Sequence, residues 1–130
     1  MTDVDAELAR FERGAIDVAG FDHGSHVRIG FELARRHPFT EAAFRFSTGL
    51  RAMAAHAGRP ALYHDTITVA FLALIAERHA GAAYRDFDAF ARDNQDLLRK
   101  DALLDWYEPA RLMSPLARAT FVLPWAAGDR

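Results

Sequence analysis

Apolar residues recur at every third or fourth position through the first half of the chain. This spacing places them on one face of an α-helix and therefore predicts amphipathic helices. The predicted helices cover residues 3–13, residues 23–37, which stop before Pro38, and residues 40–57, which end at Gly58-Arg59-Pro60. A fourth segment, residues 61–80, is apolar on nearly all sides, as is typical of a central buried helix.

The second half of the chain has a more broken pattern. It predicts a helix over residues 84–92, one or two short helices over residues 95–107 that end at Pro109, and a brief helix over residues 115–119. Residues 121–125 are apolar and are expected to lie extended against the other helices. Because strand patterns are almost absent, the prediction is one all-α domain, residues 1–130. It is a bundle of about five to seven helices with an irregular C-terminal wrap.

Composition narrows the chemistry that is available to this domain. The 130 residues include six histidines and no cysteine, which excludes disulfides, iron–sulfur clusters, thiolate zinc sites and a cysteine nucleophile. Hydrophobic residues make up 51% and charged residues 26%, as in ordinary folded domains. Catalysis or metal binding would therefore depend on histidine, carboxylate, hydroxyl and arginine side chains.

Charge and hydropathy argue against two kinds of partner. Sixteen basic and eighteen acidic residues are interspersed along the chain, so we expect no nucleic-acid interface. The longest apolar stretch, residues 69–76, is far shorter than the roughly 20 residues of a membrane-spanning helix. The N-terminal residues carry acidic side chains and no apolar stretch of the secretory type. The expectation is a cytoplasmic protein.

Two histidines stand at the start of the second predicted helix. His23 and His26 are three residues apart, a spacing that places both imidazoles on one helix face and within reach of one metal ion. Asp22 or Ser25 could cap this helix. The alternative is structural, with His23 exposed near the cap and His26 hydrogen-bonded within the packing.

A second polar group, Tyr63-His64-Asp65-Thr66, precedes the most apolar helix. Asp65 or Thr66 could cap that helix. If the helix is buried, His64 and His26 could be partners, either directly or through a metal that Asp65 or Asp22 also binds. Adjacent helical residues point about 100° apart, so one of His64 and Asp65 would be a ligand and the other would orient it.

The remaining histidines and two arginines have simpler interpretations. His37, His56 and His79 lie near predicted helix C-termini, where a positive imidazole is favourable. Arg28 is expected to form a surface ion pair. Arg118 could pair with Asp65, Asp101 or Glu108, or could bind an acidic group of a substrate.

Three separated segments carry the motifs F-x-H-x-x-H-x-R, then Y-H-D-T-I-T, then W-Y-x-P-x-x-L-x-S-x-x-A-R-x-x-F-V-L-P, which together span roughly residues 20–124. This combination resembles a family of small, mostly uncharacterised bacterial helical proteins. The matching residues are Phe21, His23, His26 and Arg28; Tyr63 to Thr68; and Trp106, Tyr107, Pro109, Leu112, Ser114, Ala117, Arg118 and Phe121 to Pro124. Relatives usually carry Glu at the position of Asp65. The resemblance implies a site at these histidines and no particular reaction.

These observations lead to one functional hypothesis and two alternatives. The leading hypothesis is a small metal-dependent enzyme that acts on a small molecule. His23, His26 and His64 would bind a divalent Fe, Zn, Ni or Cu ion, and Tyr63, Asp65 and Thr66 would serve the reaction. One alternative is a metal-free acid–base catalyst of the isomerase, cyclase or lyase type that uses His26 or His64. The other is a non-catalytic ligand- or partner-binding module, with residues 121–125 available to form a homodimer.

Overall fold

The computed structural model of the chain describes residues 3–126 and 128, which fold as a single packed bundle of helices without strands. The α-helices are α1 (Asp3–Glu12), α2 (His23–Arg36), α3 (Phe39–His56), α4 (Asp65–Ala82), α5 (Phe87–Asp93), α6 (Pro109–Leu112) and α7 (Pro115–Ala119). Short 3₁₀ turns are η1 (Val18–Gly20), η2 (Pro60–Leu62), η3 (Gln95–Leu98) and η4 (Ala102–Asp105). No helix in this part of the chain is long and apolar enough to cross a bilayer.

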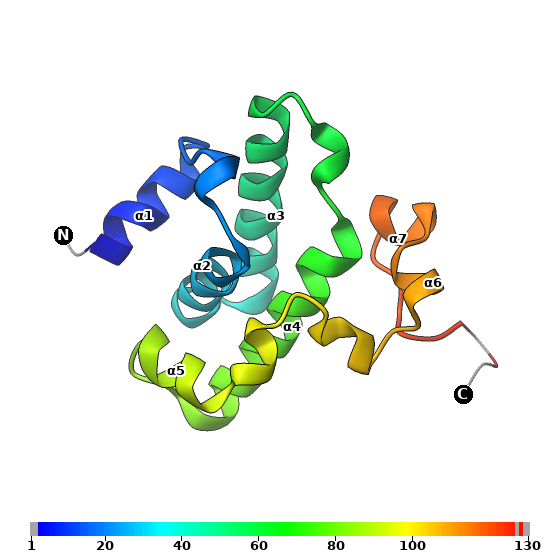
Figure 1. Cartoon of the computed structure of the whole chain (residues 1–130). Coiled ribbons are helices and arrows are strands. Elements are labelled where there is room, and N and C mark those ends of the chain that lie inside the picture. Colours follow the sequence, from blue (N-terminus) through cyan, green and yellow to red (C-terminus); the bar gives the residue numbers. More distant parts are fainter. Residues whose placement is uncertain (1–2, 127, 129–130) are drawn as a thin grey trace.

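The bundle is organised around α2 and α4, which pack against each other near its centre (Figure 1). One group of buried side chains joins these two helices to the C-terminal half and includes Phe31, Phe90 and Leu103. A second group joins α1, α2 and α3 and includes Phe11 and Leu33. Helix α4 therefore has packed neighbours on several sides, which explains why it is apolar almost all round.

The start of α4 lies later than the predicted residue 61. Pro60 opens the short turn η2, and the chain then runs extended through Tyr63 and His64 before the helix begins at Asp65. The N-cap residue of α4 is His64, whose side chain accepts the capping hydrogen bond. The prediction that Asp65 or Thr66 caps this helix is therefore wrong.

The C-terminal half follows the predicted order of elements, although α5 begins at Phe87, three residues later than predicted. Residues 95–107 form two 3₁₀ turns, and α7 covers residues 115–119 with Ser114 as its N-cap, as predicted. Pro109, however, opens helix α6, which the sequence pattern did not predict. Proline suits this first position because the N–H that it lacks would have no partner inside the helix.

Gly49 allows α1 and α3 to pack closely. A Cβ at this position would overlap the ring of Phe11, which is fully buried. We expect Gly49→Ala to lower the free energy of unfolding by about 1–3 kcal/mol through overpacking. Chemical denaturation measures the change. Gly81→Ala in α4 is the matched control, because a Cβ there meets nothing within 4 Å. Equal stability of the two variants would contradict the prediction.

Candidate functional site

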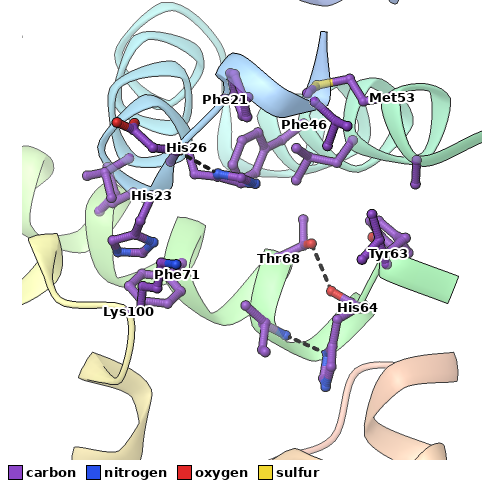
Figure 2. Close-up of a pocket in the computed structure, with 18 residues that line it drawn as sticks. Phe21, His23, His26, Phe46, Met53, Tyr63, His64, Thr68, Phe71 and Lys100 are labelled. Carbon is purple, nitrogen blue, oxygen red and sulfur yellow. Dashed lines mark hydrogen bonds between the residues drawn. The ribbon is translucent and has the colours of Figure 1, made fainter. Parts of the chain in front are cut away.

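A cavity of about 360 Å³ lies between α2, α3 and the start of α4 (Figure 2). Its walls are largely apolar, and its polar lining residues come mainly from the two groups that the sequence analysis singled out. The apolar residues include Phe21, Val27, Phe46, Leu50, Met53, Ile67, Phe71 and Ile75, and the polar ones are Asp22, His23, His26, Tyr63, His64, Thr68 and Lys100. Four of the six predicted site residues therefore line one cavity.

His26 is held in one tautomer by the first turn of α2. Its Nδ1 lies 2.9 Å from the backbone oxygen of Asp22. A carbonyl oxygen only accepts, so Nδ1 carries the proton and Nε2 keeps its lone pair. Nε2 has no hydrogen-bond partner among the described residues, and Phe21 packs against the ring at 4.5 Å. Burial lowers the pKa of His26 below its ordinary value of 6.5, and the backbone hydrogen bond to Asp22 opposes this shift. His26 is therefore a neutral acceptor at pH 7.

His64 uses both ring nitrogens to hold the backbone. Nδ1 accepts a hydrogen bond of 3.1 Å from the Ile67 N–H and so caps α4. Nε2 donates to the carbonyl oxygen of Leu112 at 2.8 Å. Burial is the main cause that lowers the pKa of His64. This neutral, buried imidazole has no lone pair left for a metal or a substrate proton.

Tyr63 and Asp65 form a small polar cluster at the edge of the cavity. The Tyr63 hydroxyl donates to Oδ1 of Asp65 at 2.7 Å, and Arg51 reaches the same oxygen at 3.3 Å. The Arg51 guanidinium also lies 4.5 Å from the centre of the Tyr63 ring. Burial and the bond to Asp65 raise the pKa of Tyr63 to about 12, so the phenol stays protonated. Asp65 orients Tyr63 and does not itself line the cavity.

Thr66 faces the C-terminal segment and lies outside the cavity lining. It is fully buried, its hydroxyl donates to the Thr120 carbonyl at 2.9 Å, and it accepts from the Val122 N–H at 3.0 Å. Arg118 binds nearby, donating to the carbonyl oxygens of Ala61 and Tyr63 at 2.6 and 3.2 Å. Backbone carbonyls therefore replace the carboxylate partners predicted for Arg118. The polar start of α4 is the attachment point of the tail.

His23 links α2 to the turn η3. Its Nε2 lies 3.0 Å from the carbonyl oxygen of Leu97, so this nitrogen carries the proton. The ring packs edge-on against Phe71 with centroids 5.0 Å apart. His23 therefore contributes one wall of the cavity and anchors the segment that continues to Lys100.

The donor set for a metal is not assembled around one point. Among the described residues there is no group of three or more histidine and acidic side chains that could hold a metal ion. Both ring nitrogens of His64 are hydrogen-bonded to the backbone. The carboxylates of Asp22 and Asp65 are hydrogen-bonded within the protein as well. Asp22 caps α2 through the Ser25 N–H at 2.8 Å. The residues present thus do not fit the predicted three-histidine centre.

The other polar predictions are resolved by tertiary contacts. Arg28 forms the expected ion pair, with two hydrogen bonds of 2.7 Å to Glu7. The three remaining histidines lie at helix C-termini as predicted, with His37 at the C-cap of α2 and His56 and His79 in the last turns of α3 and α4, and their rings contact other side chains or backbone groups. His37 pairs with Glu41 at 2.8 Å, His56 donates to Gly14 at 2.9 Å, and His79 packs edge-on against Phe31.

Thr68 and Lys100 also line the cavity, and of these two only Lys100 lies outside the motifs that the sequence singled out, since Thr68 ends the Tyr63–Thr68 motif. Thr68 donates to the His64 carbonyl at 2.8 Å, a bond typical of threonine inside a helix. Lys100 offered one signal, since it is the only lysine in the chain. The apolar walls from α3, Phe46 and Met53, could not be assigned because they look like ordinary core positions in the sequence.

Comparisons with known proteins do not assign this site. No family model matches the chain, and neither a curated protein nor a solved structure matches it. The resemblance to a family of small bacterial helical proteins therefore stays a prediction, and the cavity is the feature that points to a function.

Proposed function

We propose that the protein binds a small, largely apolar organic molecule in the cavity between α2, α3 and α4. The supporting observation is the neutral Nε2 of His26, a hydrogen-bond acceptor at a cavity whose walls are mostly aliphatic and aromatic. Ligand pockets usually combine such walls with a few polar groups that fix orientation. The ligand would donate a hydroxyl or similar hydrogen bond to His26, while Phe21, Phe46 and Met53 surround its apolar part.

The same atom supports a second candidate function, metal-free acid–base catalysis. A general base must be unprotonated near neutral pH, and burial lowers the pKa of His26 in that direction. The Tyr63 phenol also lines the cavity and stays protonated, with its proton donated to Asp65. It would act as an acid towards a bound molecule by turning its hydroxyl from Asp65 to that molecule. His64, whose nitrogens are both occupied, would stay a structural residue in this scheme.

The role of His26 predicts a difference between two matched probes. We expect wild-type protein to bind 2-naphthol about fivefold more tightly than 2-methoxynaphthalene, because only the alcohol can donate to Nε2. Isothermal titration calorimetry measures both affinities. His26→Phe should bind the two probes equally, and His26→Gln, which offers an amide oxygen, should restore part of the preference.

Two further results would contradict the proposal. One is the absence of binding by either probe to folded wild-type protein. The other is an unchanged preference for 2-naphthol in His26→Phe. A chelator separates this proposal from the metal-dependent hypothesis. If the imidazole of His26 acts without a metal, the affinity for both probes should be the same with and without the chelator.

A further inference from the structure

Basic side chains gather at one end of the cavity. Figure 2 shows His23 and Lys100 beside Phe71, with His26 projecting from the same helix as His23. All three basic residues line the cavity. Lys100 is exposed and forms no ion pair within the described part of the chain, whereas its neighbour Arg99 lies 3.5 Å from Asp105. The ammonium group of Lys100 is therefore available to a ligand.

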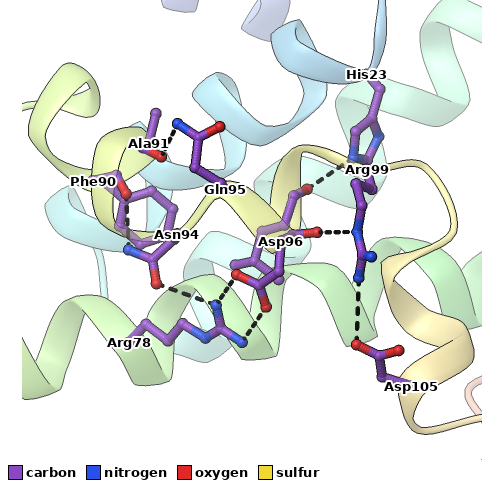
Figure 3. A network of polar contacts seen from close by, with 10 residues as sticks. His23, Arg78, Phe90, Ala91, Asn94, Gln95, Asp96, Arg99 and Asp105 are labelled. Carbon is purple, nitrogen blue, oxygen red and sulfur yellow. Dashed lines mark hydrogen bonds and ion pairs between the residues drawn. The ribbon is translucent and has the colours of Figure 1, made fainter.

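The turn η3, which ends two residues before Lys100, is anchored on two sides, as Figure 3 shows. On one side, His23 of α2 donates to the carbonyl of Leu97. On the other, Arg78 of α4 makes two hydrogen bonds of 2.7 and 2.8 Å to the carboxylate of Asp96 and a third to Asn94. These contacts hold η3 against α2 and α4. The backbone at Lys100 is thereby placed at the cavity edge, although the lysine side chain is itself free.

No acidic side chain that lines the cavity neutralises the charge of Lys100 through a direct ion pair. Asp22 is the only carboxylate among the lining residues, and its Oδ1 accepts hydrogen bonds from the N–H and hydroxyl of Ser25 at 2.8 and 2.9 Å. The walls from α3 and from the lining part of α4 contribute apolar side chains and Thr68. An acidic group on a ligand could therefore pair with the ammonium group of Lys100, next to the apolar part of the cavity.

We propose that the ligand of this cavity is an organic acid whose carboxylate pairs with Lys100 and whose apolar body fills the space between α2, α3 and α4. This inference rests on the proposed function and adds the chemical class of the ligand. A carboxylate paired with an ammonium group forms charge-assisted hydrogen bonds, which are stronger than those between neutral groups. The partly apolar surroundings strengthen the pair further, relative to one in open solvent.

The test compares 2-naphthoate with methyl 2-naphthoate, which is similar in shape, has no charge and, like the carboxylate, offers no hydrogen-bond donor to His26. We expect wild-type protein to bind the carboxylate about tenfold more tightly at neutral pH and low salt. Lys100→Met should abolish this preference, and Lys100→Arg should retain it. Arg99→Gln is the matched control, because Arg99 contacts Asp105 and does not line the cavity. Arg99 and Lys100 are both exposed, so the melting temperatures of the four proteins should be nearly the same.

Each outcome of this test has a defined meaning. Equal affinity for the two probes, or a preference that survives in Lys100→Met, would overturn the inference and leave Lys100 as an ordinary surface lysine. If 2-naphthol binds wild-type protein while the carboxylate gains nothing, only the ligand class is wrong. If no probe binds, the proposed function itself fails.

Discussion

Replacement of His64 by alanine is expected to lower the free energy of unfolding by about 2–4 kcal/mol. The variant removes the cap on the Ile67 N–H at the start of α4 and leaves the buried carbonyl of Leu112 without its donor. Loss of an N-cap costs about 1 kcal/mol, and an unsatisfied buried acceptor costs about 1–3 kcal/mol. Urea denaturation followed by circular dichroism measures the sum.

His64→Asn separates the two contributions. Asparagine is a good N-cap residue, so it should restore the bond to Ile67 while remaining too short to reach Leu112. We expect this variant to recover about 1 kcal/mol relative to alanine. Equal stability of both variants would show that the cap contributes nothing. A destabilisation by His64→Ala that appears only without chelator would instead favour the metal-ligand hypothesis.

The pH dependence of stability provides an independent measure of the same imidazole. Burial lowers the folded-state pKa of His64 below the ordinary value of 6.5, so below about that pH the unfolded chain binds a proton that the folded protein resists. Stability of the wild-type protein should therefore fall as pH drops through 6.5 towards the folded-state pKa. His64→Asn should show a shallower decline, because only His26 then contributes a lowered histidine pKa.

The helices are the part of this structure that the sequence predicts best. Helix α2 begins at His23 and α7 covers residues 115–119, as expected from apolar spacing and from Asp22 and Ser114 as cap residues. The predicted start of α4, at residue 61, is wrong for a physical reason. Histidine is rarely an N-cap, so cap preferences favour Asp65 or Thr66. The choice is made instead by tertiary contacts, because the ring of His64 can cap α4 and reach Leu112 at the same time.

The candidate site was predictable in location and much less so in chemistry. Polar runs at two helix starts singled out His23, His26, Tyr63 and His64, all of which line the cavity. Their roles depend on backbone groups distant in the sequence, since His64 bonds across 48 residues and His23 across 74. Periodicity along a helix carries no information about such partners. For the same reason the sequence could not separate His26, which keeps a free nitrogen, from His64, which does not.

Thr66 provides the second large effect, because one buried hydroxyl satisfies two backbone groups of the tail. Thr66→Val has nearly the same shape but leaves the Thr120 carbonyl and the Val122 N–H without this partner. We expect a loss of about 2–4 kcal/mol in unfolding free energy and faster amide exchange at Val122. Thr66→Ser keeps the hydroxyl and should cost about 1 kcal/mol.

The affinity for 2-naphthol distinguishes this structural role from the catalytic role predicted from the sequence. Thr66 is fully buried and does not line the cavity, so Thr66→Val should leave the affinity of the folded protein within about twofold of wild type. A large loss of affinity together with a small loss of stability would mean that Thr66 acts at the site. Equal destabilisation by valine and serine would show that the hydroxyl does not hold the tail. We expect Thr66→Val to lose stability and to keep its affinity for 2-naphthol. The reason is that Thr66 contacts the C-terminal segment and does not line the cavity.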